Sequence, residues 1–108
     1  MKKPVYSNMT WLADIETELR RIGPGDPPGR VRTVARRIAG IALQRLYRTE
    51  APDVPAVLRK AMEDDTLPDE VRGAVERLAA RLDAQFRSPS TDPIGDAQRI
   101  VEYVRIAK

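Results

Sequence analysis

Apolar residues recur at helical spacing in five stretches of the chain, and none of the apolar runs alternates with the period of two that a strand requires. Residues typical of helix boundaries separate the stretches, such as Gly23-Pro24 after the first and Asp92-Pro93 before the last. The pattern therefore predicts an all-α fold, a compact single-domain bundle of about five helices. We expect the helices to cover approximately residues 10–22, 30–49, 54–64, 67–87 and 93–107.

The helix expected over residues 30–49 has a broad apolar face, which covers more than a third of the helical wheel. Such a face indicates burial against several neighbours, and the small side chains of Ala35, Ala39 and Ala42 would let another helix approach closely. We therefore expect this helix at the centre of the bundle, with the first, fourth and fifth packed around it. The candidate core residues are Trp11, Ile15, Leu19, Val34, Ile38, Ile41, Leu46, Leu58, Val75, Leu78, Leu82, Val101 and Val104.

The length of 108 residues suits one domain, so we expect residues 1–108 to form a single helical domain, with residues 1–8 as a candidate flexible tail. The chain contains no Cys and no His. Disulfide scaffolds, Cys nucleophiles and His-based acid–base catalysis are therefore excluded, as are the usual zinc and haem ligands. We expect a protein that is not an enzyme and that uses no cofactor.

Acidic residues gather at Glu63-Asp64-Asp65, with Asp69 and Glu70 close behind. Carboxylate oxygens are ligands that Mg²⁺ and Ca²⁺ prefer, but the spacing does not match an EF-hand loop. Acids beside a helix N-terminus also have a simpler electrostatic role, because they interact favourably with the helix dipole. We therefore expect no metal site here.

The amino-terminal residues are basic, but no apolar run of signal-peptide length follows them. No stretch approaches the roughly 18 apolar residues that are needed to span a bilayer. The expected location is cytoplasmic, with no membrane partner.

Charge is divided unevenly along the chain, although the net charge is only +3. Residues 1–48 carry ten Lys and Arg against four Asp and Glu, whereas residues 49–108 carry nine against twelve. The 23 residues from Pro27 to Thr49 contain six Arg and no acid. A helix over these residues would present a basic stripe about 27 Å long, enough to follow several phosphates of a nucleic acid. The candidate polyanion-binding residues are Arg30, Arg36, Arg37 and Arg48.

The alternative is that these Arg residues are neutralised inside the fold by the acids of the second half, notably Glu63, Asp64, Asp65, Asp69 and Glu70. Aromatic residues are also few, with one Trp, one Phe and three Tyr, and base-stacking surfaces need more. Exposure of the basic stripe decides between the two interpretations.

Two functional hypotheses follow. The first is a protein-interaction or assembly module, because the apolar positions on the second and fifth helices exceed one narrow face, and surplus apolar surface is often buried against a protein partner or in a homodimer. The second is binding of nucleic acid or another polyanion through the Arg-rich helix, which would weaken as salt rises. We rank the first above the second.

Overall fold

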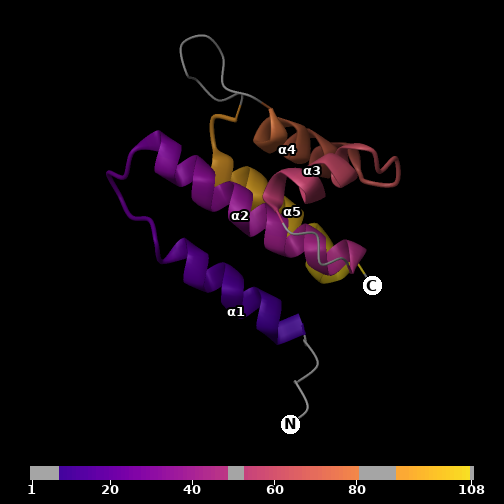
Figure 1. The fold of residues 1–108 in the computed structure, drawn as a ribbon, viewed down its shortest axis with the longest axis horizontal. Coiled ribbons are helices and arrows are strands. Elements are labelled where there is room, and N and C mark those ends of the chain that lie inside the picture. The colour runs from indigo at the N-terminus through magenta and orange to yellow at the C-terminus, as the bar shows by residue number, and fades with distance from the viewer. Residues whose placement is uncertain (1–7, 49–52, 81–89, 108) are drawn as a thin grey trace.

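A computed structural model describes residues 8–48, 53–80 and 90–107, with side chains from Trp11 onward. Within these ranges the chain forms helices and turns and no strand, which confirms the all-α prediction (Figure 1). The five helices are α1 (Asn8–Leu19), α2 (Pro28–Tyr47), α3 (Val54–Met62), α4 (Asp69–Ala79) and α5 (Pro93–Ile106).

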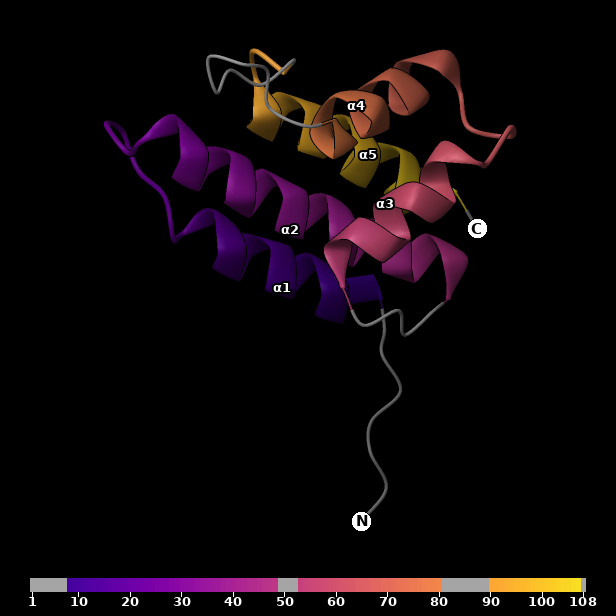
Figure 2. The same ribbon diagram turned by 45° about the horizontal axis from the view of Figure 1, so that its top comes forward.

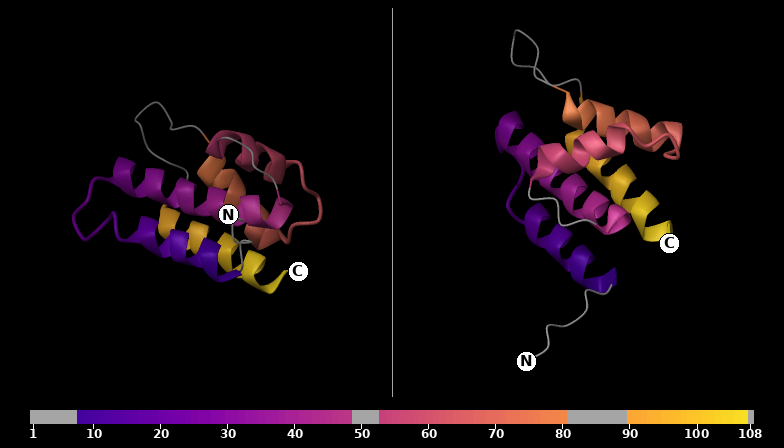
Figure 3. Two further views of the ribbon diagram at one scale, coloured as in Figure 1. Left: turned by 60° about the horizontal axis from the view of Figure 1, so that its bottom comes forward. Right: turned by 45° about the vertical axis from the view of Figure 1, so that its right-hand side comes forward.

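Helix α2 occupies the centre of the bundle and contacts each of the other four helices. Helices α1 and α5 pack against different parts of its surface, while α3 and α4 contact each other and lie together on another side of it (Figure 2). Helix α1 runs antiparallel to α2 at the edge of the bundle and packs chiefly against it (Figure 3). The pair α1–α2 is therefore a helical hairpin with one side open to solvent.

Small residues on α2 allow its neighbours to approach closely. Ala35, Ala39 and Ala42 are fully buried, as is Ala97 on α5. At Gly40, a Cβ atom would lie 3.1 Å from the Cγ2 atom of Val54, which is the first residue of α3. A larger side chain at position 40 would therefore push α3 away from α2.

Most of the predicted core residues lie inside the bundle. The buried ones are Trp11, Ile15, Val34, Ile38, Leu58, Val75, Leu78 and Val104. Four others are only partly buried and pack at the edge of the core, namely Leu19, Ile41, Leu46 and Val101. Leu82 lies outside the described residues. The core also contains Leu43, which is fully buried and which the helical wheel did not single out.

Helix α1 ends three residues earlier than predicted. The amides of Arg21 and Ile22 donate to the carbonyls of Glu18 and Leu19, three residues back, so the chain tightens into a 3₁₀-type turn before Gly23. Helix α2 begins at Pro28 rather than at residue 30 and ends at Tyr47, because Arg48 takes a left-handed conformation with φ of 51°.

Helix α4 is shorter than the expected range 67–87. It begins at Asp69 and ends at Ala79, so both predicted boundaries were wrong. Pro68 precedes the helix in an extended conformation, and Ala80 leaves it with ψ of 152°. The apolar residues after Ala80, including Leu82 and Phe86, lie outside the described residues. At the start of α5, Asp92 accepts a hydrogen bond from the amide of Gly95 at 3.0 Å, which confirms it as the capping residue.

Candidate anion-binding site

The connector between α1 and α2 forms a tight turn from Gly23 to Asp26. The amide of Asp26 donates to the carbonyl of Gly23 at 3.2 Å, and Gly25 has φ of +91°. Pro24 and Gly25 are the residue types that a type II turn requires at its two central positions. The Asp26 carboxylate also accepts a hydrogen bond from the Gly23 amide at 2.8 Å, so the turn is closed from both sides.

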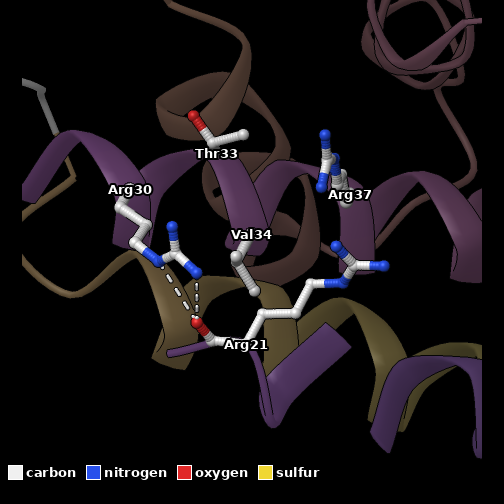
Figure 4. Close-up of a pocket in the computed structure, with 5 residues that line it drawn as sticks. All are labelled: Arg21, Arg30, Thr33, Val34 and Arg37. Carbon is white, nitrogen blue, oxygen red and sulfur yellow. Dashed lines mark hydrogen bonds between the residues drawn. The ribbon is translucent and has the colours of Figure 1, made fainter. Parts of the chain in front are cut away.

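Arg30, in the first turns of α2, folds back over the end of α1. Its Nε and Nη2 atoms donate to the backbone carbonyl of Arg21 at 3.1 and 2.8 Å, and its Nε lies 3.6 Å from the Asp26 carboxylate. The two hydrogen bonds are visible in Figure 4. They hold the guanidinium of Arg30 at the end of the hairpin where the connector joins α1 to α2.

A surface pocket of about 230 Å³ lies at this end of the hairpin. Arg30, Thr33, Val34 and Arg37 line it from α2, and Arg21 lines it from the end of α1 (Figure 4). The Arg21 side chain extends along α2 so that its guanidinium lies beside that of Arg37. The pocket therefore brings three guanidinium groups from two segments of the chain together.

The five lining residues differ in what they offer a ligand. The side chains of Arg21, Arg30 and Arg37 are each about half exposed, so their remaining N–H groups reach solvent. Val34 is buried and forms an apolar wall, and the Thr33 hydroxyl donates to the backbone carbonyl of Gly29 at 3.0 Å. The pocket is therefore dominated by positively charged donors.

One carboxylate is held between two of these guanidinium groups. Glu18 Oε2 lies 3.4 Å from Arg21 Nε, and Glu18 Oε1 lies 3.7 Å from Arg37 Nη1. The Glu18 side chain is only 15% exposed, and its Oε1 atom is buried without a hydrogen-bond partner among the described residues. Charge attraction therefore holds Glu18 here, while its hydrogen-bonding capacity is incompletely used.

Only two of the four predicted polyanion-binding residues belong to this pocket. Arg36 is half-buried on another side of α2, next to Arg32, and its Nε atom is buried without a hydrogen-bond partner among the described residues. Arg48 is exposed beyond the last turn of α2, about 27 Å from Arg30 at 1.5 Å per residue. The structure therefore groups Arg30 and Arg37 with Arg21 around one pocket and leaves Arg36 and Arg48 outside it.

Arg32 stabilises the end of α4. Its Nη2 atom donates to the carbonyl oxygen of Leu78 at 3.3 Å and also to that of Ala80. Burial, together with the nearby charge of Arg36, lowers the pKa of Arg32. A cation at a helix C-terminus satisfies carbonyls that the helix leaves unpaired, so this Arg has a structural role.

Two of the acids that were expected to neutralise the Arg residues of α2 have other partners. Asp64 accepts hydrogen bonds from the Tyr47 hydroxyl at 2.6 Å and from the Thr66 hydroxyl, and these bonds hold the pKa of Asp64 below its ordinary value. Burial and the bond to Asp64 raise the pKa of Tyr47. Asp65 pairs with Arg72 of α4 at 2.9 Å. The ion pairs of Arg30 and Arg37 come instead from Asp26 and Glu18, in the first third of the chain.

A second charged cluster joins α4 to α5. The buried carboxylate of Asp96 accepts hydrogen bonds from Arg77 Nε at 3.0 Å, from Arg77 Nη2 at 2.8 Å and from the Ser90 hydroxyl at 2.6 Å. Arg99 donates to it at 3.1 Å. Burial alone would raise the pKa of Asp96, but the bonds from Arg77 and Ser90 outweigh it and hold the pKa below its ordinary value. The cluster is satisfied internally and has the character of a structural tie.

Metal and membrane sites are not found in the described ranges. No group of three or more acidic side chains is arranged there to hold a metal ion. No helix within those ranges is long and apolar enough to cross a membrane. No protein-family model, no curated protein and no solved structure matches this chain.

Proposed function

We propose that this protein is a non-catalytic binding module that holds an anionic, phosphate-bearing group of a partner in the pocket formed by Arg21, Arg30 and Arg37. The observation that carries the proposal is the convergence of these three half-exposed guanidinium groups on one pocket. A guanidinium donates two parallel hydrogen bonds to a phosphate and stays charged at any physiological pH, so three of them suit a phosphate well.

The position of the pocket supports binding rather than a purely structural role. Arg30 is fixed by the carbonyl of Arg21 and by Asp26, so one wall of the site is formed before any ligand arrives. A preformed site loses less conformational freedom on binding than a flexible one. The hairpin also places the pocket at the edge of the bundle, where a large partner has room to approach.

Recognition through apolar surface has less support. Among the described residues, the large hydrophobic side chains that are exposed are Met62 at 46% and Ile106 at 72%. Two scattered residues are normal for a protein surface and do not define a docking face. Formation of a homodimer therefore stays a prediction, as do the absence of catalysis and the cytoplasmic location.

The proposal is tested by titrating the protein with inorganic phosphate and following the backbone amide signals by NMR. We expect saturable shifts at Gly23, Arg30, Thr33 and Arg37, and their loss in Arg37→Gln. Arg105→Gln is the matched control, because Arg105 is also half exposed and also pairs with one Glu, but at the other end of the molecule on α5. Shifts that are spread evenly over all exposed Arg residues, and that Arg37→Gln leaves unchanged, would refute the proposal.

A further inference from the structure

We propose that the ligand of the pocket is a phosphorylated serine or threonine in a peptide segment of a protein partner, and that its phosphate competes with Glu18 for the guanidinium groups of Arg21 and Arg37. This inference rests on the proposed function and names the partner of the same site. It is carried by the dimensions of the pocket, by the position of Glu18 and by the acids that flank the site.

The basic surface covers only a short stretch of α2. Arg30 and Arg37 are seven residues apart on α2, about 10 Å along the helix axis, and Arg21 lies between α1 and α2 beside them. The next Arg residues on α2 lead elsewhere, since Arg32 binds the end of α4 and Arg36 lies beside it. A nucleic-acid strand would need further cations in line to hold successive phosphates.

Glu18 shows that two of the three guanidinium groups already attract a negative charge. Its carboxylate is placed between Arg21 and Arg37 at distances of 3.4 and 3.7 Å. A phosphomonoester carries a charge of roughly −1.5 to −2 at pH 7 and has three acceptor oxygens, against one charge and two oxygens for the carboxylate. It would therefore bind the same two guanidinium groups more strongly than Glu18 does and would weaken their pairing with the carboxylate.

The surroundings of the pocket are acidic along α1. Asp14, Glu18 and Arg21 share one face of the chain at spacings of four and seven residues, and the Asp14 side chain is exposed. A polyanion that left the pocket along α1 would meet these carboxylates, whereas a peptide with one phosphate and basic neighbours would pair with them. The charge pattern therefore favours a phosphopeptide over a nucleic acid.

The test compares three fluorescent probes with the full chain by anisotropy, each at low and at near-physiological salt. The probes are a phosphoserine peptide with Arg on both sides of the phosphoserine, the same peptide without phosphate, and a single-stranded RNA of similar length. We expect the phosphopeptide to bind at least about tenfold more tightly than its unphosphorylated form, as charge-assisted hydrogen bonds to a phosphate imply. We also expect it to retain most of its affinity at the higher salt, where the RNA dissociates.

Two variants distinguish the role of Arg37, which binds the ligand, from that of Glu18, which competes with it. Arg37→Gln should reduce binding of the phosphopeptide about tenfold, while Arg105→Gln should leave it unchanged. Glu18→Gln should increase the affinity for the phosphopeptide about twofold to fivefold, because the competing charge is removed. Its matched control is Glu102→Gln, which also removes an acid paired with one Arg and should have no effect.

The outcomes distinguish this inference from the function on which it rests. Tighter binding of RNA than of the phosphopeptide, with a steep dependence on salt and a loss in Arg37→Gln, would overturn the phosphopeptide and leave the phosphate pocket in place. Equal affinity for the phosphorylated and unphosphorylated peptides would overturn the inference as well. Unchanged or weaker binding in Glu18→Gln would show that Glu18 orients the guanidinium groups and does not compete with the ligand. Failure of inorganic phosphate and of all three probes to bind would refute the proposed function itself.

Discussion

Arg77 of α4 binds Asp96 of α5 through two parallel hydrogen bonds, from Nε at 3.0 Å and from Nη2 at 2.8 Å. The Asp96 side chain is only 4% exposed, so this pair links the two helices at a point that water scarcely reaches. The hydroxyl of Ser90, which lies just before α5, donates a further hydrogen bond to the same carboxylate. A buried charge with this many donors becomes costly as soon as its partners are removed.

Replacing Arg77 by Ala should therefore destabilise the fold strongly. We expect Arg77→Ala to lower the free energy of unfolding by about 3 kcal/mol, because Asp96 then loses two charge-assisted bonds in a buried position. Urea unfolding followed by circular dichroism measures the change. Arg105→Ala, which removes an exposed ion pair with Glu102, should change it by less than about 0.5 kcal/mol. Equal effects of the two substitutions would contradict a special role for the Asp96 cluster.

Stability should also fall at acid pH, with Asp96 as one source. The pKa of Asp96 in the folded protein lies below its ordinary value of 3.8, so the unfolded chain takes up the proton first as pH falls. The stabilisation by Asp96 is therefore fully present well above that ordinary value and is lost as the pH drops through the lower pKa of the folded state. Asp64 contributes with the same sign, because its pKa is lowered too. Urea unfolding measured from pH 7 down to pH 2 should show this loss.

The variant Asp96→Asn isolates the contribution of this residue. It should be less stable than the natural sequence at neutral pH, and its stability should fall less steeply as the pH drops below the ordinary carboxyl pKa. Asp64→Asn should flatten the curve separately, because the two carboxylates belong to different clusters. An unchanged slope in Asp96→Asn would mean that the pKa of Asp96 is not lowered in the folded state.

The sequence was enough to predict five helices, but it was not enough to predict which faces of α2 meet which neighbours. Arg36 and Arg37 are adjacent in sequence and share the polar side of a helical wheel, yet Arg37 pairs with Glu18 of α1 while Arg36 lies beside Arg32. Leu43 is fully buried and Leu46 only partly, although both are Leu residues on the same helix. Both distinctions depend on where the neighbouring helices pack, and the periodicity of apolar residues within α2 does not indicate those positions.

Arg21 was missed for a related reason. It lies in the last turn of the predicted first helix and carries no signal of its own, because its role depends on the turn that returns the chain to α2. The signal that could have identified it is the short connector Gly23 to Asp26, whose Pro-Gly pair predicts a reversal of direction. A tight hairpin places the last turn of one helix beside the first turns of the next.

Gly40 should be intolerant of larger side chains because Val54 lies directly over it. A Cβ at position 40 would already be 3.1 Å from Val54 Cγ2, so the further carbons of a leucine have no space. We expect Gly40→Leu to lower the free energy of unfolding by about 1–3 kcal/mol through overpacking. Val54→Ala should recover part of this loss in the double variant, which a double-mutant cycle by urea unfolding would measure. Additive effects would show that the two residues are not in contact.

The end of α4 should become less stable when Arg32 is removed. Its guanidinium donates to the carbonyls of Leu78 and Ala80 at the carboxyl end of α4. We expect Arg32→Gln to lower the free energy of unfolding by about 1 kcal/mol and to increase amide hydrogen exchange in the last turn of α4. Exchange in α3 serves as the internal reference. Protection of α4 that is unaltered by the substitution would argue against this capping role.

Loss of Arg37 should leave the fold almost untouched, which is what separates a ligand-binding residue from a structural one. Its side chain is half exposed and its distance to Glu18 is 3.7 Å, longer than a hydrogen bond. Glu18 is largely buried but keeps its pairing with Arg21 in the variant, so we expect Arg37→Gln to change the free energy of unfolding by less than about 1 kcal/mol. Arg77→Ala, measured beside it by urea unfolding, provides the structural comparison. A large loss of stability in Arg37→Gln would contradict this prediction and would show that Arg37 is a structural residue, like Arg32 and Arg77.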